Sequence, residues 1–357
     1  MRRVVIAILV GGLVVAACGG DDEKAAPKPP ASTTTTSTIP IPIAPFTGLE
    51  DPSGVSQTRS SLAVKIENTP EARPQSGLDQ ADIVYEEVVD GGITRFWAVF
   101  NSAAPENVGP IRSVRAMDPG IVSALHGVVA YSGGTQANAD LIRAAPVVWV
   151  DENNAGDSFF REPSRSAPHN LFGRTALLWQ RGGQPVPPTP MFPYLEDGVG
   201  FVGEGMLSFH VNLDQGYDFT YQWDPAAGGW KRFQRLDEPF VAAGFPIEAQ
   251  VTPTNVILQF VDYGGAGEAN LYGSGEALVF SNGQLIRGTW AREYPYAENP
   301  TQFLDALGQP ILLTPGRTWV ELMPVGVTVD LVPAPLPPPT TLAPTTSTTV
   351  KKQGKNK

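Results

Sequence analysis

The stretch ADIVYEEVVDGGITRFWAVFN, residues 81–101, predicts the element on which the fold is built. Its two runs of β-branched and aromatic residues flank the turn sequence Asp90-Gly91-Gly92, a pattern typical of a β-hairpin. The stretch SLAVKIEN, residues 61–68, alternates apolar and polar positions and predicts another strand. The folded part of the chain therefore opens with a small group of strands.

Strand and helix patterns alternate after this hairpin. Asp118 and Thr135 each stand where a helix is expected to begin, and both are residue types that cap a first turn. Helices are expected at 117–126 and 135–145, and strands at 127–133 and 146–152. Such alternation indicates helices layered on a sheet. We assign residues 46–186 to an N-terminal α/β domain whose sheet is mixed.

The second half of the chain consists of short apolar runs separated by turn sequences such as AAGG and SNGQ. This pattern predicts a mostly-β C-terminal domain over residues 203–332. NPTQFLDALG, residues 299–308, is the main window with helical periodicity and predicts a helix. Proline-dense residues 187–202 predict a connector. The predicted fold class is α+β, with an α/β domain followed by a mostly-β domain, each with its own core.

The first residues predict export. Arg2 and Arg3 precede an apolar run that is too short for a comfortable membrane span, so residues 1–17 are interpreted as a signal peptide. VAAC then matches a lipobox and predicts lipidation of Cys18. The alternative is a plain secretory signal with a chance cysteine. Because Cys18 is the only cysteine, the sequence excludes a disulfide and a cysteine metal site.

Low-complexity segments flank the folded part. Residues 18–45 are rich in proline and threonine and predict a disordered tether, and residues 333–357 predict a similar tail ending in lysines. The expected partners are the membrane, through the N-terminal lipid, and a cell-wall polymer or an envelope protein. The net charge of −11 and the export signal both exclude a nucleic-acid partner.

Two arginines three residues apart raise the question of what they bind. VGPIRSVRAMD, residues 108–118, predicts a loop that presents Arg112 and Arg115. Their planar guanidinium groups suit a carboxylate or a phosphate. The internal alternative is a network in which Glu86 or Glu87 of the hairpin pairs with Arg112, Arg115 or Arg95. Both interpretations hold if the network leaves one arginine free for a ligand.

Two further loops carry candidate residues. YSGGTQAN, which contains Ser132, Gly133 and Gly134, follows a strand and begins a helix whose N–H groups could hold an anion, or it is ordinary turn chemistry. FFREPSRSAPHNLF brings four polar side chains into one loop: Arg161, Arg165, His169 and Asn170. His169 could act as a general base, or it could brace the loop through hydrogen bonds. The scattered histidines lack metal-ligand spacing, so no metal and no cofactor is expected.

Several long stretches resemble the YerB-like family of bacterial lipoproteins. In the first half they are VKIENTPEARPQSGLDQADIVYEEVVDGGITRFWAVFNS, VGPIRSVRAMD and SAPHNLF. In the second half they are NVILQFVDY, GEALVFSNGQLIRGTW and LTPGRTWVELMP. The resemblance implies an exported, membrane-anchored envelope protein with a two-domain body. It supplies no activity and no catalytic residues.

The sequence therefore predicts the function only in general terms. We expect a lipoprotein on the outer face of the bacterial cell membrane that binds an anionic wall component or an envelope protein. A hydrolase or transferase acting on cell-wall glycan is the first alternative, since acidic residues are present but their separation cannot be read from sequence. A structural spacer is the second, and the sequence does not decide whether the protein is an enzyme.

Overall fold

The computed structural model describes residues 40–182, 187–213, 216–243, 248–264, 268–293 and 298–335. The predicted signal peptide, Cys18 and nearly all of the predicted tether and tail lie outside these residues. Ala44 and Phe46 are buried, so the folded part begins before residue 46, where the prediction started it. No helix in the described ranges is both long enough and apolar enough to cross a membrane.

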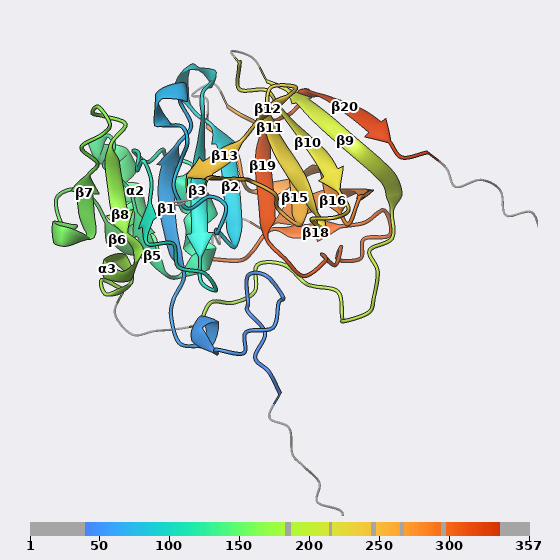
Figure 1. Cartoon of the computed structure of the whole chain (residues 1–357), viewed down its shortest axis with the longest axis horizontal. Helices are drawn as coiled ribbons and strands as arrows, with labels where there is room; N and C mark the ends of the chain where they lie inside the picture. Colours follow the sequence, from blue (N-terminus) through green and yellow to red (C-terminus); the bar gives the residue numbers. More distant parts are fainter. Residues whose placement is uncertain are drawn as a thin grey trace, which may run out of the picture. The chain divides into compact units, whose positions relative to one another are not determined.

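Three strands at the start of the folded part confirm the predicted hairpin (Figure 1). They are β1 (Leu62–Glu67), β2 (Ile83–Val88) and β3 (Thr94–Phe100), and β3 pairs antiparallel with both of the others. Gly91 and Gly92 in the turn have φ of 78° and 74°, a region that favours glycine. All residues of β1 and β3 are buried, so this part of the sheet is covered on both faces.

Helices and parallel strands complete the N-terminal half. The elements are α1 (Asp118–Val122), β5 (Val128–Ala130), α2 (Gln136–Ala144), β6 (Val148–Val150) and α3 (Thr175–Trp179), with a small sheet of β4 (Asn107–Val108), β7 (Phe159–Arg161) and β8 (Leu171–Arg174). Thr135 caps α2 as predicted, accepting a hydrogen bond from the N–H of Asn138. Asp118 does not cap α1; Met117 occupies the cap position, and the Asp118 carboxylate binds groups elsewhere.

Short 3-10 helices connect these elements. They are η1 (Val55–Gln57), η2 (Pro70–Ala72), η3 (Asp90–Gly92), η4 (Ser123–Leu125) and η5 (Gly156–Ser158).

The second half is built of strands, which confirms the α+β class with a mostly-β C-terminal part. They are β9 (Glu204–Asn212), β10 (Phe219–Asp224), β11 (Gly229–Gln234), β12 (Glu238–Pro239), β13 (Val241–Ala243), β14 (Glu248–Gln250), β15 (Asn255–Val261), β16 (Gly273–Ser281), β17 (Gln284–Arg292), β18 (Gln302–Leu304), β19 (Thr318–Pro324) and β20 (Thr328–Pro333). The helix predicted at 299–308 is wrong. Its centre forms β18, where Phe303 pairs with Trp290 of β17 and is buried.

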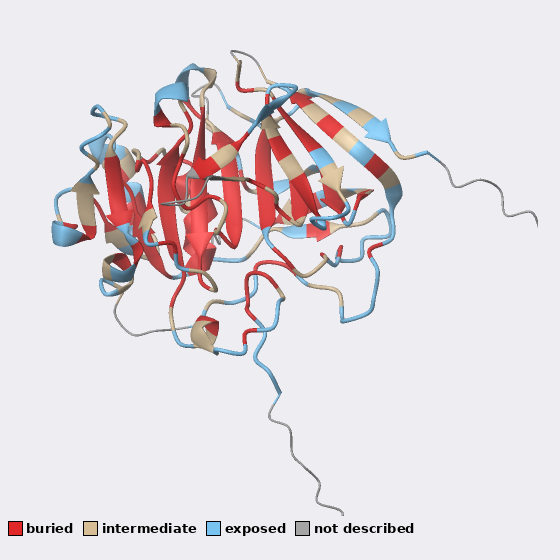
Figure 2. Ribbon diagram, viewed as in Figure 1, coloured by how far each residue is buried: buried red, intermediate tan, exposed pale blue. Residues whose placement is uncertain are grey.

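One sheet runs through both halves. Its strand order is β12-β11-β10-β9-β17-β16-β15-β19-β2-β3-β1-β5-β6, with β18 on β17 and β20 on β9. The join is a parallel pairing of β2 with β19, from Ile83 opposite Thr318 to Glu87 opposite Leu322. Figure 2 shows the buried strands continuing across this join without an exposed break.

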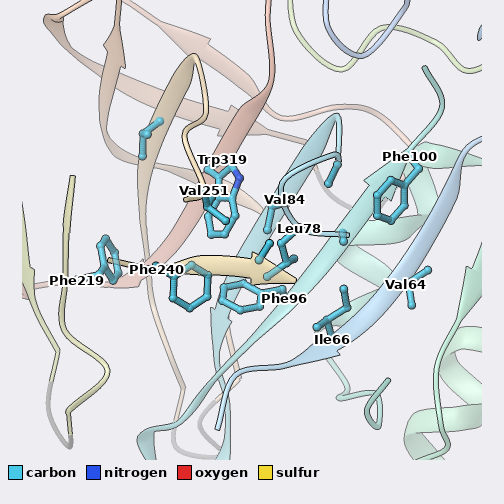
Figure 3. Packing of buried hydrophobic residues seen from close by; sticks show 14 of the residues in the cluster. Val64, Ile66, Leu78, Val84, Phe96, Phe100, Phe219, Phe240, Val251 and Trp319 are labelled. Atoms are coloured by element: carbon cyan, nitrogen blue, oxygen red, sulfur yellow. The ribbon is translucent and has the colours of Figure 1, made fainter. Parts of the chain in front are cut away.

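The expectation of two separate cores is therefore wrong. Both hydrophobic clusters contain residues from the two halves. In Figure 3, Phe96 of β3 lies beside Phe240 and Trp319, with ring centroids 5.9 and 5.4 Å away. The connector also packs on the body, since Met191 and Phe192 are buried and the Tyr194 hydroxyl donates to the Phe46 carbonyl at 2.5 Å.

A buried ion cluster accompanies the join. Nη2 of Arg232 on β11 lies 2.7 Å from Oε2 of Glu86 on β2, and both side chains are fully buried. Glu321 of β19 stands opposite Glu86 and accepts a hydrogen bond from the Tyr221 hydroxyl at 2.7 Å. Burial and then the neighbouring Glu86 raise the pKa of Glu321 well above its usual range, which favours its protonated form beside Glu86.

Candidate functional site

A polar cluster lies at the carboxyl ends of the parallel strands β1 and β5. The loop that carries the two arginines crosses this edge: the Arg112 N–H donates to the Lys65 carbonyl at 2.9 Å, and the Ser132 N–H donates to the Arg112 carbonyl at 3.0 Å. Val114 donates to the Gly133 carbonyl at 2.9 Å. This edge of a sheet is where ligands commonly bind in α/β folds. The structure thus brings together the predicted loop and the predicted turn.

Glu67, the last residue of β1, is the centre of the outer layer. Its Oε1 lies 2.8 Å from Nη2 of Arg112 and accepts a hydrogen bond from the Thr69 hydroxyl at 3.1 Å. Its Oε2 lies 3.0 Å from Nδ1 of His169. The Glu67 side chain is 1% exposed, whereas those of Arg112 and His169 are 21% and 22% exposed. Glu67 therefore fixes two groups that reach the surface.

Arg115 and Arg95 lie beside this pair. Nε of Arg115 is 2.8 Å from Oδ2 of Asp90 in the hairpin turn, but the approach lacks hydrogen-bond alignment, and Asp90 is 69% exposed. Arg95 of β3 is buried and donates from Nη1 to the Ser113 carbonyl at 2.6 Å. The Nε groups of Arg95, Arg112 and Arg115 are all buried without a hydrogen-bond partner among the described residues. We call these three residues the arginine site.

The predicted partners of the arginines were wrong. Neither Glu86 nor Glu87 binds Arg112 or Arg115, because the two glutamates lie on opposite faces of β2 and each meets a different cation. Glu86 binds Arg232 of the C-terminal half. Glu87 binds Lys65 beneath the arginine site. The hairpin does supply one partner, but it is Asp90 in the turn.

Lys65, Glu87 and Asp118 form an inner layer with no exposed side chain. Nζ of Lys65 contacts Glu87 closely and lies 2.8 Å from Oδ1 of Asp118, which also accepts a hydrogen bond from Nε1 of Trp97 at 2.9 Å. Burial and then the charge of Asp118 raise the pKa of Glu87 to about 8. Glu87 is therefore largely uncharged at neutral pH, and one lysine balances one aspartate.

The electrostatic state of Arg95 follows from its neighbours. Burial, then Arg115 and Arg112, lower the pKa of Arg95 to about 10. This mutual repulsion of three guanidinium groups would be relieved by a bound anion.

The turn after β5 supports the arginine loop. The hydroxyls of Ser113 and Ser132 are 3.3 Å apart. A Cβ at Gly134 would lie 3.0 Å from a methyl of Val114, so a small residue permits this close packing. No contact shows Gly133 or Gly134 holding an anion, and that part of the prediction stays a prediction.

The loop before β8 is held mainly by Arg165 and Asn170. Arg165 donates to the carbonyls of Ala72 and Pro74 at 2.8 and 2.7 Å, and Nδ2 of Asn170 donates to the Arg165 carbonyl at 3.1 Å. Arg161 binds Glu152 at 3.0 Å and is about half exposed. Of the four candidates in this loop, His169 is the one that contacts Glu67.

Glu67, Lys65, Asp90 and Asp118 were not among the predicted site residues. The sequence did contain a pattern that could have identified Glu67 and Lys65. They are two residues apart in a strand that is otherwise apolar, so both side chains point to the same face. Two cavities, of about 500 and 750 Å³, are lined by residues other than the arginine site, including Trp290 in one and Phe303 in the other. That Arg112 or Arg115 borders a ligand cleft stays a prediction. The described residues contain no cluster of three or more potential metal ligands.

Comparison with known proteins agrees with the resemblance noted in the sequence. Residues 46–184 match the N-terminal domain, and residues 209–320 the C-terminal domain, of a family described as "Protein of unknown function (DUF3048)". The chain is 26% identical over 300 residues to a Bacillus subtilis (strain 168) protein named "Putative lipoprotein YerB", covering 79% of this chain and 86% of that protein. The crystal structure of the Bacillus subtilis YerB protein superposes with a TM-score of 0.67 at 22% identity, covering 81% of this chain and 99% of the other, which supports the fold. The chain therefore belongs to the YerB-like family of DUF3048 proteins.

Proposed function

We propose that this protein is an exported, lipid-anchored envelope protein whose arginine site binds an anionic group of a wall component or envelope partner. The lipobox at Cys18 supports the anchor, as does the name of the Bacillus subtilis relative. The arginine site supports the ligand class.

The observation that carries the anion proposal is the convergence of Arg95, Arg112 and Arg115. The buried Nε–H groups of Arg95 and Arg112 lack a hydrogen-bond partner in the described part of the chain, and that of Arg115 lies 2.8 Å from Asp90 without hydrogen-bond alignment. An unsatisfied buried donor costs about 1–3 kcal/mol, so a ligand that accepts from these groups recovers part of that cost. Phosphate and carboxylate oxygens match the planar guanidinium fork.

The local charge balance points the same way. Four cations lie in the two layers: Lys65, Arg95, Arg112 and Arg115. The four acidic residues among them are Glu67, Glu87, Asp90 and Asp118. Glu87 is largely protonated at neutral pH, and solvent screens the exposed Asp90. With Glu87 protonated, the cluster carries one positive charge in excess, within a protein of net charge −11.

Calorimetric titration of the full-length protein in detergent with inorganic phosphate, at low ionic strength, tests this proposal. Arg112→Gln and Arg115→Gln should each weaken binding about 10- to 100-fold, because a hydrogen bond to a charged group contributes about 1.5–3 kcal/mol. Arg287→Gln is the matched control, since the Arg287 side chain is 55% exposed and lies 3.7 Å from Glu204. Acetate in place of phosphate distinguishes a carboxylate ligand.

Wild-type protein that binds neither anion would refute the proposal. An equal loss of binding in the Arg287→Gln control would refute the assignment of the site, since it would show that any surface arginine serves.

A further inference from the structure

We propose that His169, oriented by Glu67, acts as a general base and that the arginine site thereby hydrolyses a phosphodiester. This inference rests on the proposed function, because the arginines must hold the phosphate. His169 is the catalytic residue of the pair, and Glu67 positions it.

The tautomer of His169 is set by Glu67. An ionised carboxylate only accepts hydrogen bonds, so Nδ1 of His169, 3.0 Å from Oε2 of Glu67, carries the proton in the neutral ring. Nε2 is then the basic nitrogen. A buried carboxylate that orients an imidazole in this way is the arrangement that general bases use in hydrolases.

Nε2 of His169 is open for such a role. It has no hydrogen-bond partner among the residues that the structure describes, and the side chain is 22% exposed. Arg112 and His169 bind the two oxygens of the same carboxylate, so the imidazole lies beside the arginine site. Glu67 therefore holds the proposed base close to the proposed anion site.

The loop does not need His169 as a brace. Arg165 already fixes the segment to the carbonyls of Ala72 and Pro74, and Asn170 fixes it to Arg165.

The arginines favour a phosphodiester as the reacting group. If the bound anion is itself the reacting group, its central atom must be open to attack, as phosphorus is and a carboxylate carbon is not. Phosphoryl transfer depends mainly on positioning and on stabilising charge on the equatorial oxygens, which guanidinium groups do. A phosphodiester linkage is the simplest substrate that is both anionic and cleavable by water.

The proposed step conserves atoms and charge. Nε2 of His169 accepts a proton from water as the water oxygen bonds to phosphorus. The bond from phosphorus to the leaving oxygen breaks, and that oxygen keeps the electron pair and takes a proton from solvent. The products are a phosphomonoester and an alcohol, and His169 returns its proton to solvent.

The test is hydrolysis of bis(p-nitrophenyl) phosphate by the full-length protein in detergent, with p-nitrophenyl acetate as an uncharged ester. His169→Ala should slow hydrolysis of the diester about 10²- to 10⁴-fold, the usual effect of removing a general base. Its affinity for inorganic phosphate should change less than threefold, which separates this proposal from the binding proposal. Ser164→Ala is a matched control in the same loop, because the exposed Ser164 hydroxyl donates to Glu162 and not to His169, and it should keep most of the rate.

Glu67→Gln tests the positioning role through the dependence of rate on pH. The charged groups that face His169 are Glu67 on β1, Glu71 on η2 and Arg112 in the arginine loop. Removing the charge of Glu67 should shift the acidic limb of the rate profile to lower pH, whereas a merely structural role would lower the rate without moving the limb. A melting measurement confirms that each variant is folded.

Two substrates, a polymer and a lipid, distinguish the source of the phosphodiester. Phosphorus NMR would follow cleavage of poly(glycerol phosphate) and of phosphatidylglycerol vesicles, and cleavage of either supports the proposal while naming its source. Wild-type protein that binds phosphate but hydrolyses no diester would overturn it, as would a His169→Ala variant with an unchanged rate or cleavage of the acetate alone.

Discussion

Replacing Arg232 by methionine should destabilise the whole folded body. Nη2 of Arg232 lies 2.7 Å from Glu86, and Nε lies 4.0 Å from Glu321, with no side chain of the three exposed. Methionine keeps apolar contact with Phe240, whose ring centroid is 4.3 Å from the guanidinium, but supplies no charge. Glu86 is then left buried without its cation. Breaking a buried pair in this way costs about 3–5 kcal/mol.

The effect is large relative to the total. Domains are stable by about 5–15 kcal/mol, so a loss of about 3–5 kcal/mol in Arg232→Met should remove about a fifth or more of the free energy of unfolding. Urea denaturation, followed by tryptophan fluorescence and circular dichroism, measures it. Because the sheet and both hydrophobic clusters join the two halves, the two signals should shift together in one transition.

Two further variants isolate the cause. Lys231→Met, on the same strand, removes a pair with Asp224 at 2.6 Å in which the lysine is 41% exposed, and should cost about 0–1 kcal/mol. Adding Glu86→Gln to Arg232→Met should recover part of the loss, since the stranded charge is then removed. A loss below about 1 kcal/mol for Arg232→Met, or separate transitions for the two halves, would refute the reasoning.

Two other predictions concern the anchor and the inner layer. Cys18→Ala should abolish labelling with radioactive fatty acid and release the protein from membranes washed with carbonate; retention after the wash would mean another anchor. Folded Glu87, with its pKa raised from 4.5 to about 8, holds a proton across that window that the unfolded chain has lost, so its contribution lowers stability as pH rises. The stability of Glu87→Gln relative to wild type, measured by urea denaturation, should therefore increase from pH 5 to pH 8, and a constant difference would contradict the assignment.

Local sequence patterns predicted the elements that depend on local chemistry. The glycines of the hairpin turn and the Thr135 cap specify β2–β3 and the start of α2 without distant contacts. The helix predicted at residues 299–308 was wrong because the apolar residues that gave the helical periodicity lie in different environments. Phe303 is buried against β17, whereas Leu307 is 84% exposed in the following turn.

The pairing of β2 with β19 could not be predicted in the same way. Most residues of each strand are apolar and buried, which indicates burial on both faces but does not identify the neighbouring strand. A change of pattern between the halves and a proline-dense connector suggested two cores. The shared sheet arises instead from long-range pairing, and the connector packs along the body that it was expected to separate.

The site shows the same limit at the scale of single residues. Lys65 and Glu67 fall on one face of a buried strand, and that alone requires counter-charges close by, since unpaired buried charges are costly. Which charges meet them depends on where other loops return to the strand end. Arg112 comes from the loop after the hairpin, and His169 lies 102 residues beyond Glu67. The sequence could therefore predict that charged groups meet Lys65 and Glu67. It could not predict that Glu67 would hold an arginine with one oxygen and a histidine with the other, which is the feature on which the proposed chemistry depends.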